Sequence, residues 1–424
     1  MSLMFNPLKL PNGQSFTNRL CKAAMEENMA EAGQIPGTAL EILYKVWGEG
    51  APGLILTGNV MVDPKALTGP GGVVLQKGTL EQGDNRERFE RWSAAAKAGG
   101  SKVWMQISHP GRQVYNSQGT EAVSASATKV RMAGAEKMFD TARKLEGAEI
   151  KTLIKRFADT AEAAESCGFD GVEIHAAHGY LVAQFLSPLT NLRGDEWGGT
   201  LENRARFLLE IVRAVRGRVS AGFGVGVKLN SADFQKGGFE LEDARRVVQM
   251  LSAEGVDLVE LSGGSYESAA MMGMARDERL TSSAAREMYF VEFAADIAKS
   301  ATMPIMVTGG VTEKSTAAAA LSSGSVDMIG IARAFAYAPH LPKDWASSND
   351  NSENEARVIL PKIAFKNKLL TALGNMSVTK TQLHRLSAGK LPKINANPIL
   401  SIIADRVRVS KKTKLYKMWL KTQN

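Results

Sequence analysis

The organisation of this chain is clearest in one stretch, Gly171-Val-Glu-Ile-His-Ala-Ala-His-Gly-Tyr-Leu181. It begins with a short apolar run, Gly171–Ile174, which is typical of a buried strand. His175, His178 and Tyr180 follow at once, so groups that donate or exchange protons stand where the strand ends. If this strand belongs to a parallel sheet, similar runs must recur along the chain.

Such runs do recur, and eight can be identified: Leu20–Ala24, Gly53–Thr57, Lys102–Ile107, Gly171–Ile174, Gly224–Leu229, Leu258–Leu261, Ile305–Thr308 and Met328–Ile331. Near-continuous apolar runs suit parallel strands that are covered on both faces. Segments with a helical spacing of apolar residues lie between them, at Ile150–Ser166, Leu201–Arg216, Leu241–Ala253, Ala284–Lys299 and Glu313–Ser323. This alternation predicts an α/β fold, a (β/α)8 TIM barrel with a C-terminal extension.

The length of 424 residues fits one barrel with insertions. We predict a barrel over residues 1–345 and a basic, partly helical extension over residues 346–424. The long segment 108–144 is expected to cross the barrel mouth, and the polar segment 344–355 to form a surface loop.

The net charge of +8 describes the extension rather than the barrel. After Met376, eleven Lys and Arg residues stand against one acid, Asp405. The rest of the chain is close to neutral, so no nucleic-acid partner is expected for the barrel. The extension also carries apolar residues among its lysines. It can be a helix packed on the barrel with solvated lysines, or a segment that contacts an anionic membrane surface or nucleic acid.

Several protein classes are excluded by composition. No apolar stretch is long enough to span a membrane, and the N-terminus does not resemble a secretory signal, so we expect a cytoplasmic protein. The two cysteines, Cys21 and Cys167, are too few for an iron–sulfur cluster and are expected to be reduced, buried thiols. The sequence leaves a homo-oligomer open.

Polar residues gather after the predicted strands, where barrels form their active sites. Gly309 and Gly310 follow the seventh strand and Arg333 follows the eighth, a combination that favours a phosphate site. An ordinary tight turn is the alternative. His175 and His178 can be metal ligands, core histidines or paired donors to a substrate oxygen; because no acid or cysteine completes a ligand set, we expect no metal. Tyr180 is then a candidate general acid.

Four blocks of sequence resemble the Old Yellow Enzyme family of FMN-dependent ene-reductases, the NADH:flavin oxidoreductases. They are Asn18-Arg-Leu-Cys-Lys-Ala-Ala-Met25, Gln106-Ile-Ser-His-Pro-Gly-Arg112, Gly171–Leu181 with its continuation through Asn191 to Asp195-Glu-Trp-Gly-Gly-Thr-Leu-Glu-Asn-Arg204, and Gly330-Ile-Ala-Arg333. The resemblance implies FMN bound at the strand ends and NADH or NADPH as hydride donor. It also implies a ping-pong cycle that reduces the activated alkene of a small-molecule substrate, such as an α,β-unsaturated carbonyl compound.

The resemblance also implies roles for individual residues. Tyr180 is expected to protonate the substrate, while His175 and His178 hold its electron-withdrawing oxygen. Gln106 and Lys228 are expected at the polar edge of the flavin, although both can be polar residues of the barrel interior. The remaining cofactor-binding residues are expected to line the flavin ring, namely Ala24, Met25 and Asn59, or to hold its phosphate, namely Gly309, Gly310, Ala332 and Arg333.

One position departs from the family pattern. Glu26 follows Met25 where relatives commonly have Thr or Cys, and a carboxylate beside the flavin predicts an altered reduction potential. The leading hypothesis is an ene-reductase. A flavin-dependent reductase or demethylase-type enzyme acting on another small molecule is the first alternative, and a noncatalytic flavoprotein that works through its basic tail is the second.

Overall fold

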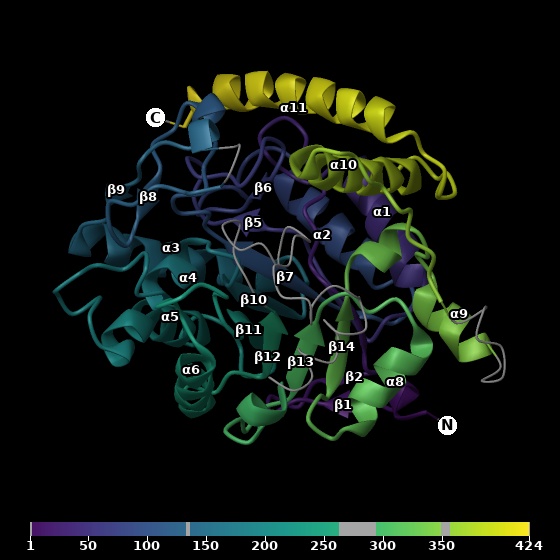
Figure 1. Cartoon of the computed structure of the whole chain (residues 1–424), viewed down its shortest axis with the longest axis horizontal. Helices are drawn as coiled ribbons and strands as arrows, with labels where there is room; N and C mark the ends of the chain where they lie inside the picture. The colour runs from purple at the N-terminus through teal and green to yellow at the C-terminus, as the bar shows by residue number, and fades with distance from the viewer. Residues whose placement is uncertain (1, 133–135, 263–293, 349–356, 424) are drawn as a thin grey trace.

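A closed barrel of eight parallel strands forms the centre of the molecule (Figure 1). The computed structural model describes residues 2–132, 136–262, 294–348 and 357–423. The barrel strands are β3 (Leu20–Lys22), β4 (Leu54–Leu56), β7 (Lys102–Ser108), β10 (Gly171–Ala176), β11 (Gly224–Asn230), β12 (Leu258–Ser262), β13 (Ile305–Thr308) and β14 (Met328–Ile331). The pairings β7–β10 and β14–β3 close the ring. The predicted barrel is confirmed, and the strand ends differ from the prediction by at most two residues.

Helices surround the barrel. They are α1 (Thr38–Glu49), α2 (Asn85–Ala96), α3 (Gly147–Ser166), α4 (Leu181–Leu186), α5 (Leu201–Arg216), α6 (Leu241–Ala253), α8 (Lys314–Ser322) and α9 (Leu341–Ser347). Helix α3 begins three residues before the predicted start, because Glu146 and Glu149 form a reciprocal capping box there. The predicted helix 284–299 lies outside the described residues as far as residue 293. The predicted loop 344–355 begins inside α9, and from residue 349 it lies outside the described residues.

The floor of the barrel is filled by one large side chain, Trp104. It is fully buried and lies against Gly171 of β10 and Gly224 and Gly226 of β11. A Cβ at Gly224 would come within 2.2 Å of its ring. Phe16 of β2 (Ser15–Phe16) meets the same ring edge-on, with 5.7 Å between ring centroids. The strand glycines therefore make room for an aromatic plug that closes the end of the barrel opposite the carboxyl ends of the strands.

Two long helices, α10 (Lys368–Leu386) and α11 (Pro398–Leu420), occupy the segment predicted as a partly helical extension. Helix α10 packs on α1, and α11 lies across the outside of α10 (Figure 1). The carboxyl-terminal half of α11 reaches β5 (Val60–Met61) and β6 (Val73–Val74), where Tyr416 is buried and its hydroxyl donates to the Pro64 carbonyl at 2.7 Å. The division of the chain at residue 345 stays a prediction. None of the helices in the described residues is long and apolar enough to cross a membrane.

Candidate active site

Strand register brings the predicted site residues to one end of the barrel. Gln106 is level with Glu173 across β7 and β10, and His175 is level with Lys228 across β10 and β11. Thr308 is level with Gly330, so the segments that follow β13 and β14 leave the barrel side by side. The carboxyl ends of parallel strands therefore gather residues that are distant in sequence.

His175, His178 and Tyr180 form a compact aromatic cluster. The ring centroids of His175 and His178 are 5.1 Å apart, and those of His175 and Tyr180 are 4.7 Å apart. Tyr180 is buried and stands at the N-cap position of α4. The chain turns sharply at His178, which has a φ of +58°, a conformation uncommon for residues other than glycine.

Two neighbours hold His178 in this turn. Its backbone N–H donates to Asn230 Oδ1 at 3.0 Å, and its Nε2 lies 2.8 Å from Ser262 Oγ. Both neighbours stand at the ends of the next strands, β11 and β12. Asn230 therefore holds the backbone of His178 and Ser262 contacts its ring, so strain at this residue is compensated by side chains from two neighbouring strands.

Both imidazoles are neutral at neutral pH. Burial lowers the pKa of His175 well below its usual value, and the nearby His178 and Lys228 lower it further. Burial, followed by Lys228, lowers the pKa of His178 in the same way. Nδ1 of His175 accepts the Ala177 N–H at 3.3 Å, which leaves the proton on Nε2. His175 can thus donate a hydrogen bond without carrying a charge.

A buried group of polar side chains lies beside the histidines. Lys228 Nζ donates to Glu260 Oε1 at 2.5 Å, and Gln106 Nε2 donates to Glu173 Oε2 at 2.6 Å. Burial disfavours the charge on Lys228, but its surroundings, Glu260 foremost, outweigh burial and raise the lysine pKa. Burial also opposes ionisation of Glu260, yet Lys228 lowers its pKa. Burial and the adjacent Glu260 raise the pKa of Glu173 well above its usual value, so one ion pair and one neutral acid share the interior.

Sequence reasoning missed the two acids and Ser262. Glu173 lay inside the opening motif, and Glu260 interrupts the apolar strand Leu258–Leu261. A charged residue in a strand that is covered on both faces must have a buried partner. Glu260 and Lys228 occupy level positions on β12 and β11, but this register cannot be derived from either strand alone.

The expected phosphate site lies between the ends of β13 and β14. Gly309 is half-buried, and Gly310 is exposed with a φ of +67°. Ala332 is half-buried, and the exposed Arg333 begins a short 3-10 helix, Arg333–Ala336. Helix α8 begins only at Lys314, so the two glycines lie in the turn before it and not at its first residues. Donors for a phosphate would come from the glycine turn and Arg333 rather than from the start of α8.

The residues expected along the flavin ring follow β3 and β4. Ala24 and Met25 are half-buried just beyond β3. Asn59 Nδ2 donates to Glu26 Oε1 at 2.9 Å, and the Thr68 hydroxyl bonds the same oxygen. The Glu26 carboxylate is therefore engaged by neighbouring side chains. The effect of Glu26 on the reduction potential stays a prediction.

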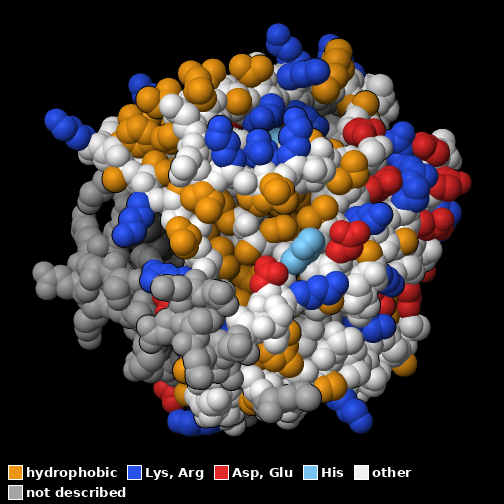
Figure 2. Space-filling view, turned by 90° about the vertical axis from the view of Figure 1, so that its right-hand side faces the viewer, with side chains coloured by type: hydrophobic (Ala, Val, Ile, Leu, Met, Phe, Trp, Pro, Cys, Tyr) orange, Lys and Arg blue, Asp and Glu red, His pale blue; other side chains and the backbone are white. Residues whose placement is uncertain are grey.

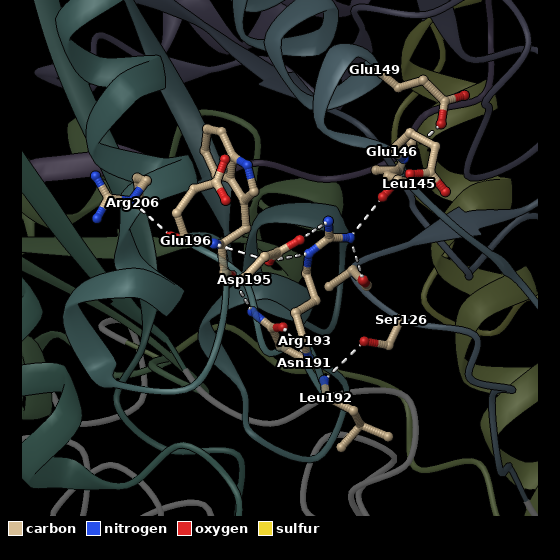
Figure 3. Close-up of polar contacts among 12 residues, drawn as sticks. Ser126, Leu145, Glu146, Glu149, Asn191, Leu192, Arg193, Asp195, Glu196 and Arg206 are labelled. Carbon is tan, nitrogen blue, oxygen red and sulfur yellow. Dashed lines mark hydrogen bonds and ion pairs between the residues drawn. The ribbon is translucent and has the colours of Figure 1, made fainter.

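The block around Asn191 has a structural role (Figure 3). Arg193 is buried and forms an ion pair with Asp195 at 2.6 Å. Its guanidinium also donates to the carbonyls of Ala125 and Leu145, at 3.0 and 2.7 Å. These carbonyls flank β8 (Val123–Ser124) and β9 (Arg143–Lys144) of the long segment after β7. Arg193 therefore ties this segment to the loop that follows α4.

The donor set fits FMN. Lys228 would supply a buried ammonium group and Gln106 a buried side-chain carbonyl for the polar edge of an isoalloxazine, and the glycine turn with Arg333 suits a phosphate. Asn59 Oδ1 is buried with no hydrogen-bond partner among the described residues, as expected of an acceptor that a ligand would satisfy. A separate cavity of about 870 Å³ lies beside His109, and none of the predicted site residues lines it.

Comparison with known proteins identifies the family. Residues 3–351 match the NADH:flavin oxidoreductase / NADH oxidase family. This chain belongs to that family. It is 35% identical over 373 residues to the NADH-dependent flavin oxidoreductase iliE of Hypocrea jecorina (strain QM6a), covering 84% of this chain and 92% of the relative. It is 40% identical over 341 residues to the NADH-dependent flavin oxidoreductase nadA of Aspergillus parasiticus, covering 78% and 75%.

Solved structures agree with this assignment. The old yellow enzyme homologue of Zymomonas mobilis superposes with a TM-score of 0.68 at 25% identity, covering 84% of this chain and 97% of that one. The protein is an oxidoreductase of the FMN-dependent family, with NADH or NADPH as donor. The predicted family, enzyme class and cofactors are confirmed at this level.

Proposed function

We propose that this protein reduces the activated carbon–carbon double bond of a small molecule, such as an α,β-unsaturated carbonyl compound, in a ping-pong cycle. Bound FMN would supply the hydride-transfer chemistry that links NADH or NADPH to the alkene. The observation that carries the proposal is the cluster of His175, His178 and Tyr180 at the carboxyl end of β10. It combines neutral hydrogen-bond donors with a protonated acid in a buried site.

In this proposal His175 binds the substrate's electron-withdrawing oxygen. Its proton stands on Nε2, and the depressed pKa keeps the ring neutral, so it can donate without placing a fixed charge beside the substrate. His178 supports the same oxygen; Ser262 contacts its ring, and Asn230 holds its backbone. Both groups withdraw electron density from the double bond and make its far carbon electrophilic.

Tyr180 would supply the proton that completes the reduction. A phenol has an unperturbed pKa near 10, so it is protonated at neutral pH. Burial of the ring next to His175 restricts its rotation and keeps its hydroxyl at the site. A positioned general acid contributes about 10²–10⁴-fold in rate.

Lys228 and Gln106 would orient the flavin. Lys228 keeps its charge because Glu260 compensates it, so a fixed cation is available at the polar edge of the ring. Gln106 is held by Glu173 and keeps its side-chain carbonyl for a ring N–H. The contacts of Lys228 and Gln106 with the flavin are part of the proposal.

The test uses the purified full-length protein. We expect a flavin absorbance band that NADH or NADPH bleaches under anaerobic conditions and that a simple cyclic enone restores, with one saturated product formed per reduced flavin. A protein that binds flavin and accepts hydride but is reoxidised by no enone, while oxygen still reoxidises it, would contradict the alkene as substrate and favour another small-molecule acceptor.

A further inference from the structure

The outward face of α11 is divided into an apolar half and a basic half. Its first turns expose large aliphatic side chains, namely Ile399 at 57%, Leu400 at 65%, Ile403 at 54% and Val407 at 64%. Its last turns expose Lys411, Lys414, Lys417 and Lys421, together with Met418. Spacings of three and four residues place these side chains on one side of the helix. We call this face the α11 outer face.

The loop before α11 extends the apolar half. Leu391 is 82% exposed and Ile394 is 46% exposed, and Lys390 and Lys393 alternate with them. Exposed aliphatic side chains occur singly on most soluble surfaces, whereas contiguous groups mark interaction sites. Hydrophobic side chains (orange) and basic side chains (blue) gather along the top edge of the molecule in Figure 2, where α10 and α11 lie.

The inner side of α11 is anchored, so the outer face cannot simply turn inward. Tyr416 packs with Met61, Leu67 and Val74 and bonds the Pro64 carbonyl. Lys412 Nζ donates to the Ala30 carbonyl on the same side. The helix therefore lies fixed on the barrel, and its exposed apolar and basic residues face outward.

The charged side chains that this face exposes are all basic. The only acid in the sequence of α11, Asp405, is half-buried and lies 3.9 Å from Lys380 of α10, so it is directed toward the neighbouring helix. The exposed residues of α11 include no acid. A complementary partner must combine dense negative charge with a region that accepts aliphatic side chains.

We propose that the α11 outer face docks the enzyme on an anionic membrane surface. A helix that lies in the plane of the interface could place the aliphatic residues of its first turns among the acyl chains and the lysines of its last turns at the phosphate level. Lysines near such a surface also gain from its negative potential. The apolar end would enter the bilayer surface, and the lysine row would lie along the lipid headgroups.

Two other partners fit the face less well. Nucleic acid would satisfy the lysines but would leave the four aliphatic side chains without a role, because single strands are bound by aromatic stacking and duplexes through phosphates. A second copy of the chain would have to bury the lysine row, whereas lysine is depleted at protein interfaces. Both remain outcomes of the test.

The test measures co-sedimentation of the full-length, flavin-loaded protein with vesicles of phosphatidylcholine, with and without phosphatidylserine. Lys411→Gln/Lys414→Gln is compared with Lys9→Gln/Lys299→Gln, two exposed lysines elsewhere on the surface. Leu400→Ser/Ile403→Ser is compared with Leu3→Ser/Ile359→Ser, which are also exposed. Flavin content, melting temperature and NADH oxidation confirm that each variant is folded, so the result is independent of the proposed alkene reduction.

We expect salt-sensitive binding to vesicles that contain phosphatidylserine. Loss of the two α11 lysines should weaken it roughly 30-fold and loss of the two aliphatic residues at least about tenfold, with both controls unchanged. Folded variants that bind as tightly as the native protein would overturn the proposal. So would binding to DNA or RNA probes without vesicle binding, or a dimer that Leu400→Ser/Ile403→Ser converts to monomer.

Discussion

At the scale of single residues, the most unusual feature away from the site is a buried lysine. Lys22 of β3 is fully buried and donates to the Leu56 carbonyl at 2.9 Å. Its Nζ lies 3.7 Å from Glu27 Oε1 and 4.2 Å from the centre of the Trp47 ring. Burial lowers its pKa to about 8, although Glu27 opposes the shift. The lysine is therefore retained by a carboxylate and an aromatic face rather than by water.

Replacing Lys22 alone should lower the free energy of unfolding more than replacing both Lys22 and Glu27. We expect Lys22→Met to lower the free energy of unfolding by about 3 kcal/mol, because Glu27 is left buried, with the Tyr44 hydroxyl as its side-chain hydrogen-bond partner among the described residues. Lys22→Met/Glu27→Gln should recover most of that loss. Thermal unfolding of both variants, with the exposed Lys45→Met as control, measures the difference. A double variant as unstable as the single one would contradict this account.

Some site residues could be predicted from the sequence, whereas others could not. His175, His178 and Tyr180 were found because they follow a strand directly, and local sequence is sufficient for that. Glu260 was missed as the partner of Lys228, because the pairing depends on the register between two strands. The arrangement of Glu26 with Asn59 and Thr68 also depends on loops that meet only in the folded chain.

At the scale of elements, apolar runs located the eight barrel strands, since strands buried on both faces leave a continuous pattern. Helices α5 and α6 begin and end where their apolar spacing predicted. The six-residue helix α4 was missed because it is too short for a period to be recognised, and all of its residues are buried. The role of the glycines of β10 and β11 could not be predicted from the sequence, because it depends on their contact with the Trp104 ring in the folded chain.

This packing predicts a contrast between two glycines. Gly224→Ala should lower the free energy of unfolding by about 1–3 kcal/mol, because its Cβ would overlap the Trp104 ring. Gly222→Ala is a matched control two residues earlier, where a Cβ meets nothing within 4 Å. Thermal unfolding compares them. Equal melting temperatures for the two variants would show that Trp104 can move aside and that the floor of the barrel is loosely packed.

At the scale of the whole molecule, a barrel is combined with a C-terminal helical extension. The barrel places a flavin-type site at the carboxyl ends of its strands, and the extension lies beside it with a face of its own. The basic character of the extension was evident from composition, but its orientation was not, because α11 has apolar residues on both sides. Only its packing through Tyr416 and Lys412 distinguishes the anchored side from the outer face.

The central claim is that the cluster after β10 serves substrate reduction. Stopped-flow spectroscopy of the native protein and Tyr180→Phe separates the two halves of the cycle by following flavin absorbance. We predict that NADH bleaches the flavin at similar rates in both proteins, whereas reoxidation by an enone is about 10²–10⁴-fold slower in Tyr180→Phe. Reoxidation by oxygen should be unchanged. Equal enone rates, or a parallel loss in both halves, would contradict the assignment of Tyr180 as the acid.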